Sequence, residues 1–239
     1  MRPLTTSELL DLWQEGGRMG PVERTLRLVG TASDARTLGE MARLSIGERD
    51  LRLLQLREWL FGSRLSFLVN CPLCSALNEW DGDLGELRLQ DHRPDDAGRR
   101  YACETDGYHL SYRLPNTEDL YGERDEKKIL INCILSLEDE QGPCAPEDCP
   151  DTVLQDLARQ IEIQDPQADI RFTVHCPACG HNWQTFFDIG GYLWAEIDSW
   201  AKHTLEEIYL LAFYFGWSEQ AILSMAPGRR QLYVQMIRS

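Results

Sequence analysis

Two distant segments of the chain, residues 67–74 and residues 172–179, share the template F-x-V-x-C-P-x-C. In each, a β-strand pattern runs into a tight turn that carries two thiols at the spacing of a zinc knuckle. Four thiolates suit the tetrahedral, sulfur-rich coordination that structural zinc prefers. The sequence therefore predicts one structural zinc ion per chain, bound by Cys71, Cys74, Cys176 and Cys179.

The spacing between the two cysteine pairs leaves alternatives open. A zinc ribbon usually separates its pairs by about 15–20 residues, whereas residues 75–175 intervene here. The shared site therefore requires a hairpin and helices inserted within the ribbon. The alternatives are two turns without metal, two separate metal sites, or a thiol redox motif. A redox function is disfavoured because a reactive Cys of this kind lies at a helix N-terminus, which lowers the pKa of its thiol. The residues after each pair here do not resemble such a helix.

The remaining cysteines are harder to assign. Cys133 lies in a helical apolar pattern and is expected in the core. Cys103 falls in a predicted hairpin and has no obvious partner, while Cys144 and Cys149 lie in a proline-rich stretch. That last pair could hold a second ion, but an incidental pair is the simpler interpretation. His175 and His181 flank the second knuckle and could replace a thiolate, although four cysteines make this unnecessary.

Both ends of the chain show helical patterns. Thr5 with Glu8, and Ser45 with Glu48, form predicted capping boxes at the start of two helices. Pro21 is placed to open a helix that reaches about Val29. A short helix is predicted over residues 37–43, and the helix that begins at Ser45 should end at Gly62. In the C-terminal region, helices are predicted from about 193 to 215, ended by Gly216, from Ser218 to about Met225, and from Pro227 to Ile237.

The middle of the chain mixes strands and helices. Residues 99–114 predict a hairpin with an Asp106-Gly107 turn. A helix is predicted from about Asn116 to Leu137, with Gly122 as a candidate break. An irregular connection is predicted over residues 138–150, followed by a second helix to about Ile163. A return strand is expected at residues 183–187 after the second knuckle.

Together these patterns predict an α+β fold. Helical N- and C-terminal regions flank a four-cysteine zinc-ribbon β-module with an inserted hairpin and helices. The expected boundaries are residues 1–63 for the N-terminal helical region, 64–190 for the β-module and 191–239 for the C-terminal helical region. The insert occupies about residues 81–169.

The charge of the chain disfavours several classes of function. The net charge is −15, and residues 71–170 carry the whole excess with 24 acidic against 9 basic residues. Such a surface repels phosphate backbones, so a nucleic-acid partner is not expected. It is either a solvated face or a docking site for a basic partner. The longest uncharged apolar stretch, residues 208–217, is about half of what a membrane-spanning helix needs. Because residues 1–20 lack the apolar core of a signal peptide, a cytoplasmic location is expected.

The sequence offers little for catalysis. It contains no glycine-rich phosphate loop, no H-E-x-x-H and no G-x-S-x-G motif. Asp198, Glu206 and Glu207 near His203 resemble the polar side of a helix. A helix-turn-helix spacing over residues 218–236, with Arg229-Arg230, hints at DNA, but two packed helices fit the acidic body better.

Several segments resemble the T4-type bacteriophage baseplate assembly family, whose relatives also occur in contractile injection gene clusters. The resemblance spans most of the chain and is weakest in the acidic insert. Its motifs are both knuckles and residues 44–50 (LSIGERD), 56–62 (LREWLFG), 165–169 (DPQAD), 187–189 (FDI), 193–197 (LWAEI) and 214–219 (YFGWSE), followed by the closing Arg229-Arg230 with Tyr233.

The resemblance implies a non-enzymatic baseplate or hub assembly factor, or a minor component of a contractile tail. Expected partners are other baseplate, hub or tape-measure proteins. It leaves open the stoichiometry, the choice between assembly chaperone and permanent component, and the choice between phage and injection system. The alternative function is a zinc-ribbon nucleic-acid or transcription-associated module. The surfaces predicted to meet partners are the acidic insert and the C-terminal aromatics Trp194, Trp200, Tyr209, Tyr214 and Trp217, most of which could instead be core.

Overall fold

The computed structural model describes residues 1–33, 37–88, 98–121 and 125–238. Its N-terminal region consists of helices α1 (Thr6–Gly16), α2 (Pro21–Thr31), α3 (Leu38–Ala42) and α4 (Ile46–Phe61). The predicted capping box at Thr5 is confirmed, and Pro21 opens α2 as expected. At the start of α4 the Ser45 hydroxyl accepts the Glu48 N–H, while the Glu48 carboxylate pairs with Arg52 at 2.8 Å.

Each cysteine knuckle lies at the tip of its own antiparallel hairpin. Strands β1 (Arg64–Asn70) and β2 (Leu77–Asp83) form one two-stranded sheet, and β7 (Arg171–His175) and β8 (Asn182–Phe186) form another. The two hairpins share a stack of aromatic rings. Trp80 lies 4.9 Å from Phe172, and Phe67 lies 4.8 Å from the same ring, between ring centroids. The expected β-module is thus a pair of hairpins joined by side chains.

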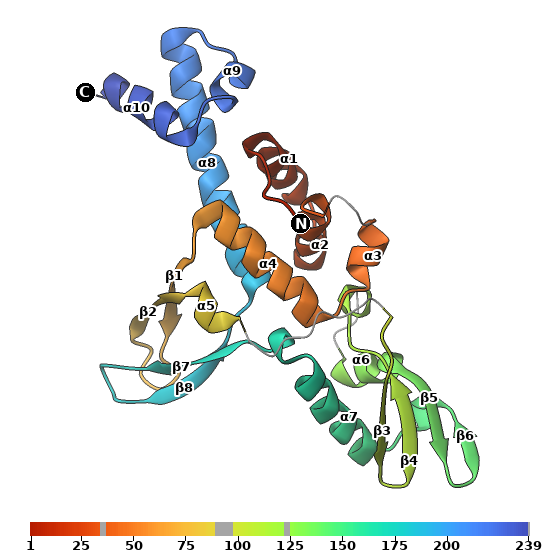
Figure 1. The fold of residues 1–239 in the computed structure, drawn as a ribbon. Coiled ribbons are helices and arrows are strands. Elements are labelled where there is room, and N and C mark those ends of the chain that lie inside the picture. Colours follow the sequence, from red (N-terminus) through yellow and green to blue (C-terminus); the bar gives the residue numbers. More distant parts are fainter. Residues whose placement is uncertain (34–36, 89–97, 122–124, 239) are drawn as a thin grey trace.

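The main core lies between the N-terminal helices and the first half of α8 (Ile189–Phe215). Leu28, Leu53 and Leu193 are among its fully buried side chains. Arg57 fixes α4 to α8 through a two-bond ion pair with Glu196, at 2.7 and 2.9 Å. The N-terminal helices and the two hairpins are therefore held on one end of α8 (Figure 1).

The other half of α8 extends away from this body, as Figure 1 shows. Gly216, in the left-handed region with φ 68°, ends the helix as predicted. Helices α9 (Glu219–Leu223) and α10 (Pro227–Arg238) then fold back against α8. Arg230 of α10 is buried and bonds the buried Glu207 carboxylate at 3.1 Å. This pair joins the last helix to the long one.

The segment between the hairpins builds a second body with its own sheet and core. The sheet has the order β3-β4-β5-β6, from β3 (Tyr101–Thr105), β4 (Tyr108–Tyr112), β5 (Ile134–Asp139) and β6 (Gly142–Cys144). Helices α6 (Glu126–Cys133) and α7 (Asp151–Gln164) accompany it, whereas the short helix α5 (Leu84–Leu87) follows β2 and packs into the main core. The hairpin turn at Asp106-Gly107 is confirmed, with φ values of 48° and 78°.

Two sequence predictions in this body are wrong in part. The helix expected from Asn116 to Leu137 is confirmed over α6, but Thr117–Leu120 form a 3-10 turn and strand β5 begins at Ile134. The break expected near Gly122 lies outside the described residues. The connection expected to be irregular over residues 138–150 contains β6. Ile134 and Leu137 are both buried, and their spacing of three residues suits a helix. Their backbones instead pair with β4 across a bulge at Ser111/Tyr112, a tertiary contact that local pattern does not reveal.

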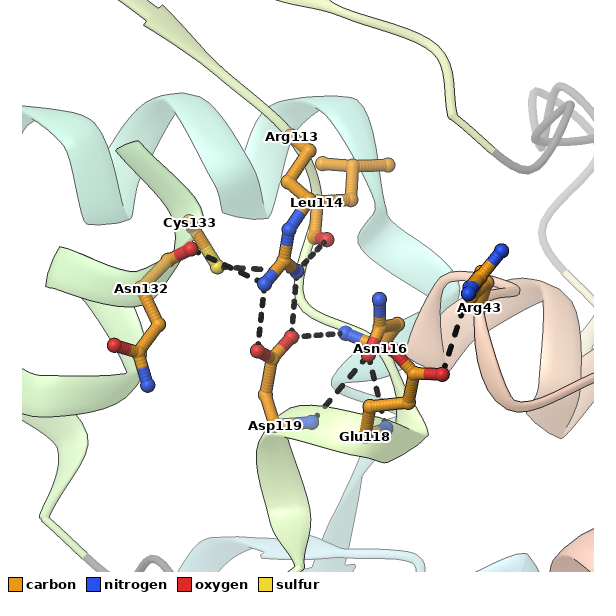
Figure 2. A network of polar contacts seen from close by, with 8 residues as sticks. All are labelled: Arg43, Arg113, Leu114, Asn116, Glu118, Asp119, Asn132 and Cys133. Carbon is orange, nitrogen blue, oxygen red and sulfur yellow. Dashed lines mark hydrogen bonds and ion pairs between the residues drawn. The ribbon is translucent and has the colours of Figure 1, made fainter. Parts of the chain in front are cut away.

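A network of polar contacts fastens this second body to the helical region (Figure 2). Arg113 donates to both carboxylate oxygens of Asp119, at 2.6 and 2.7 Å. Asn116 caps the 3-10 turn and forms a β-bridge with Ser45, directly before α4. Glu118 reaches Arg43 at 3.5 Å, after α3. These contacts join the insert to the residues between α3 and α4.

Candidate metal centre

The four predicted ligands lie together at the tips of the two hairpins. All four sulfur atoms lie within 4.8 Å of one another. The Sγ atoms of Cys71 and Cys179 are 3.7 Å apart, and so are those of Cys74 and Cys176. Each of these short contacts joins one hairpin to the other, so the quartet bridges residues more than a hundred positions apart in sequence.

Both knuckles are built by the same backbone bonds. Cys71 N–H donates to Ala76 C=O at 2.9 Å, and Ser75 N–H donates to Cys71 C=O at 2.9 Å. In the second knuckle Cys176 takes the same two roles with His181 and Gly180. The turn needs a positive φ after the second cysteine, which Gly180 supplies at 74° and Ser75 at 58°. The repeated sequence template thus encodes a repeated structure.

Two of the sulfur–sulfur distances match those of a zinc site. With Zn–S bonds of about 2.3 Å, a tetrahedral site places its sulfurs roughly 3.8 Å apart, close to the two distances of 3.7 Å. Cys71 and Cys176 are buried, whereas Cys74 and Cys179 are exposed. The quartet is therefore reachable from solvent on one side and anchored in protein on the other.

The electrostatics of the quartet also suit a cation. Burial raises the pKa of the Cys176 thiol, but the N–H groups of Cys179 and Ala178 outweigh burial and bring the pKa to about 6. The His181 N–H lowers the pKa of Cys179, whereas burial and the neighbouring thiols raise that pKa to about 12. The neighbouring thiols thus lower the pKa of Cys176 and raise that of Cys179, so they favour one thiolate and oppose a second. A divalent ion would offset that opposition.

The other sulfur and imidazole candidates lie elsewhere. His175 Nδ1 contacts the Asn182 side chain at 2.8 Å, and the His181 ring stacks on Trp183. Cys133 is buried beside Arg113, and burial raises the pKa of its thiol to about 12. Cys103, Cys144 and Cys149 pack into the core of the insert. Within the described residues, none of these side chains joins a cluster of three or more candidate metal ligands.

The five aromatic residues predicted to meet partners fall into two groups. Trp194 and Trp200 are half-buried against the main core, and Trp217 is half-buried against Phe215 and Tyr233. Tyr209 and Tyr214 are exposed on the extended half of α8. Phe213 is even more exposed beside them, and its position four residues after Tyr209 was a signal available in the sequence.

None of the described helices has the length and apolar character needed to cross a membrane.

The comparison with protein families identifies a matching family model. The family model described as T4 bacteriophage base plate protein covers residues 28–194, which is more than half of the 239-residue chain and includes all four cysteines. The comparisons with curated proteins and with solved structures gave no match.

Proposed function

The chain belongs to the T4 bacteriophage base plate protein family, and we propose that it is a non-enzymatic assembly factor or minor component of the baseplate or hub. The particle would be a contractile phage tail or injection system. One structural zinc ion, bound by the cysteine quartet, holds the scaffold together. The observation that carries this proposal is the convergence of the four sulfurs from both sides of a large insert.

A zinc ion in this quartet would be structural. Four thiolates complete a tetrahedral shell, so no position is left for a water molecule or a substrate. Structural zinc contributes on the order of 10 kcal/mol to the folded state in zinc-finger peptides. That contribution supports two short hairpins, which are marginal on their own.

The acidic residues that sequence reasoning considered for catalysis have structural partners. Asp198 accepts hydrogen bonds from Trp13 at 2.9 Å and from Lys202 at 2.6 Å. Glu206 pairs with Arg238, and Glu207 pairs with the buried Arg230. These contacts join α1 and α10 to α8, which supports a scaffold role for this helix.

Two surfaces support binding to other tail proteins. Residues 101–164 carry 15 acidic and 5 basic residues, and Glu104, Glu138, Glu140 and Glu147 are exposed on the insert. The extended half of α8 exposes Tyr209, Phe213 and Tyr214. Aromatic side chains on a projecting element are frequent anchors of protein interfaces. The proposed partners are other baseplate, hub or tape-measure proteins.

The alternative of a nucleic-acid module has less support. Arg229 stacks over Tyr233, and Arg230 is buried against Glu207. The two arginines that would start a recognition helix are therefore engaged within the protein. The acidic insert adds repulsion toward phosphates.

The proposal is tested with the variant Cys74→Ser. Cys74 is exposed, so the change removes a sulfur with little loss of packing. We expect about one zinc ion per wild-type chain, loss of that ion in Cys74→Ser, and loss of assembled tails in cells that produce this variant. Cys144→Ser, outside the quartet, is the matched control and should keep both. Zinc-free wild-type protein, or normal tails from Cys74→Ser cells, would contradict the proposal.

A further inference from the structure

Two unpaired strand edges line one groove beside the aromatic stack. Within the described part of the chain, β1 pairs only with β2, and β8 pairs only with β7. A groove of about 350 Å³ is lined by residues 67–69 of β1, residues 185–186 of β8, residues 187–188 directly after it, and Gly191 and Tyr192 at the start of α8. Unpaired edges of this kind can accept another strand.

The hydrogen-bond pattern shows which backbone groups of β1 face away from β2. Cys71 N–H bonds Ala76 C=O at one end of the hairpin, and Leu84 N–H bonds Ser63 C=O at the other. Because bonded pairs alternate in an antiparallel ladder, the odd-numbered residues of β1 bond β2. The N–H and C=O groups of Ser66, Leu68 and Asn70 therefore point away from it.

The same reasoning applies to β8. Phe187 N–H bonds Ile170 C=O, and Cys176 N–H bonds His181 C=O. The odd-numbered residues of this strand therefore bond β7. The backbone groups of Gln184 and Phe186 point away from it, and Phe186 also lines the groove.

Tyr192 already occupies the first position along the edge of β1. Its hydroxyl accepts the Ser66 N–H at 3.4 Å and donates to the Ser66 C=O at 3.0 Å. The Tyr192 side chain thus forms the two hydrogen bonds with the Ser66 backbone that a neighbouring strand would otherwise form. The next outward-facing residue, Leu68, has no such partner among the described residues.

The side chains around the groove specify an apolar occupant. Leu68 is 62% exposed and Phe186 is 54% exposed, although both are large and apolar. Phe67, Phe187 and Tyr192 line the groove itself. Alternate side chains of a strand placed there would contact the aromatic rings on one face. The side chains between them would lie beside the exposed Leu68 and Phe186 on the other face.

We propose that this groove binds a short, extended, apolar segment of another protein, which adds a strand to the free edge of β1 at Leu68. Main-chain hydrogen bonds would provide affinity, and the aromatic floor would select apolar side chains. The inference rests on the proposed function in one respect, namely that the segment belongs to another tail protein. The first knuckle directly follows Asn70, so a bound metal ion would hold in place the strand edge to which the segment binds.

The probe is a display library of random peptides, selected on immobilised full-length protein loaded with zinc. We expect enriched peptides with a continuous apolar core and no proline in it. The affinity of a synthetic peptide with an enriched sequence should be about tenfold or more lower for the variants Leu68→Glu and Phe186→Glu than for the wild-type protein. Leu77→Glu is the matched control, because Leu77 is 61% exposed on β2 of the same hairpin and lies outside the groove.

A second form of the peptide separates strand addition from apolar contact alone. N-methylation of one central amide removes a donor and keeps every side chain, so it should weaken binding about tenfold or more. Failure to enrich any peptide, equal losses in the Leu77→Glu control, or indifference to N-methylation would each overturn the inference. Normal tail assembly with Leu68→Glu would also overturn it, while loss of assembly with Cys74→Ser would leave the proposed function in place.

Discussion

At the scale of the residue, Asp50 shows how tightly the start of α4 is packed. Asp50 is buried beside Arg49, with a contact of 2.7 Å between the guanidinium and the carboxylate. Asp165 approaches the same turn and accepts the Gly47 N–H at 2.9 Å, where a Cβ on Gly47 would collide with the carboxylate. Burial raises the pKa of Asp50 to about 6, although Arg49 lowers it, and Asp188 and Asp165 add to the rise.

This pKa predicts an unusual dependence of stability on pH. Because the folded pKa lies above the unfolded value of 3.8, the charged form opposes folding, fully above about pH 6 and progressively less as the pH falls toward 4. Asp50→Asn should therefore raise the free energy of unfolding by about 3 kcal/mol near pH 7.5, and the gain should shrink near pH 4.5. Urea titrations at both pH values measure it.

The control for this variant is Asp11→Asn. Asp11 is exposed on α1 and should change the free energy of unfolding by less than about 0.5 kcal/mol at either pH. A gain from Asp50→Asn that is equal at the two pH values would show that burial of charge is not its cause.

At the scale of the element, the sequence predicted those features that local chemistry determines. The Thr5 capping box, the Asp106-Gly107 turn and the Gly216 helix end each depend on a few neighbouring residues, and all three are confirmed. Strand β5 was missed because its helical spacing is overruled by pairing with β4, from which it is separated by a 3-10 turn and helix α6. Such pairing is decided by tertiary contacts.

The candidate metal centre was predictable for a related reason. Thiol chemistry and a repeated template identify Cys71, Cys74, Cys176 and Cys179 without knowledge of the intervening fold. The groove between β1 and β8 was not predictable, because it depends on how two hairpins lie relative to each other and to Tyr192. Nothing in the local pattern of either hairpin specifies that arrangement.

Two glycine-to-alanine substitutions, one at the end of α8 and one at the start of α10, should change stability in opposite directions. Gly216 has φ 68°, so Gly216→Ala should lower the free energy of unfolding by about 1 kcal/mol. Gly228 lies in α10 with open space around its Cβ position, so Gly228→Ala should raise the free energy of unfolding by up to about 1 kcal/mol. Urea unfolding followed by tryptophan fluorescence compares them. Effects of the same sign would contradict the assigned backbone conformations.

At the scale of the whole molecule, three buried clusters among the described residues each stabilise a different part of the protein. The main core joins the N-terminal helices, the hairpins and the first half of α8. A second cluster belongs to the insert, and a third joins α8 to α9 and α10. The insert contributes no side chain to the metal centre. Its N-terminal end nevertheless follows one of the two cysteine hairpins, and its C-terminal end precedes the other. A metal ion would thus close the loop that contains the insert.

The separation of these clusters predicts which parts of the protein would lose stability without a bound zinc ion. Removal of zinc with a chelator should accelerate amide hydrogen exchange in β1, β2, β7 and β8, because the hairpins lose a contribution on the order of several kcal/mol. Strand β4 and helix α7 should keep their protection, since Leu110, Val153 and Leu157 form a core within the insert. Mass spectrometry of exchanged peptides resolves the two regions.

Two controls make this measurement decisive. Added zinc should restore protection in the wild-type hairpins, and the chelator should leave Cys74→Ser unchanged, because that variant has already lost the ion. If chelation removed protection from α7 as much as from β1, the insert and the hairpins would unfold as one unit. If it left β1 protected, the aromatic stack of Phe67, Trp80 and Phe172 would hold the hairpins without metal, and the quartet would not be the clamp between them.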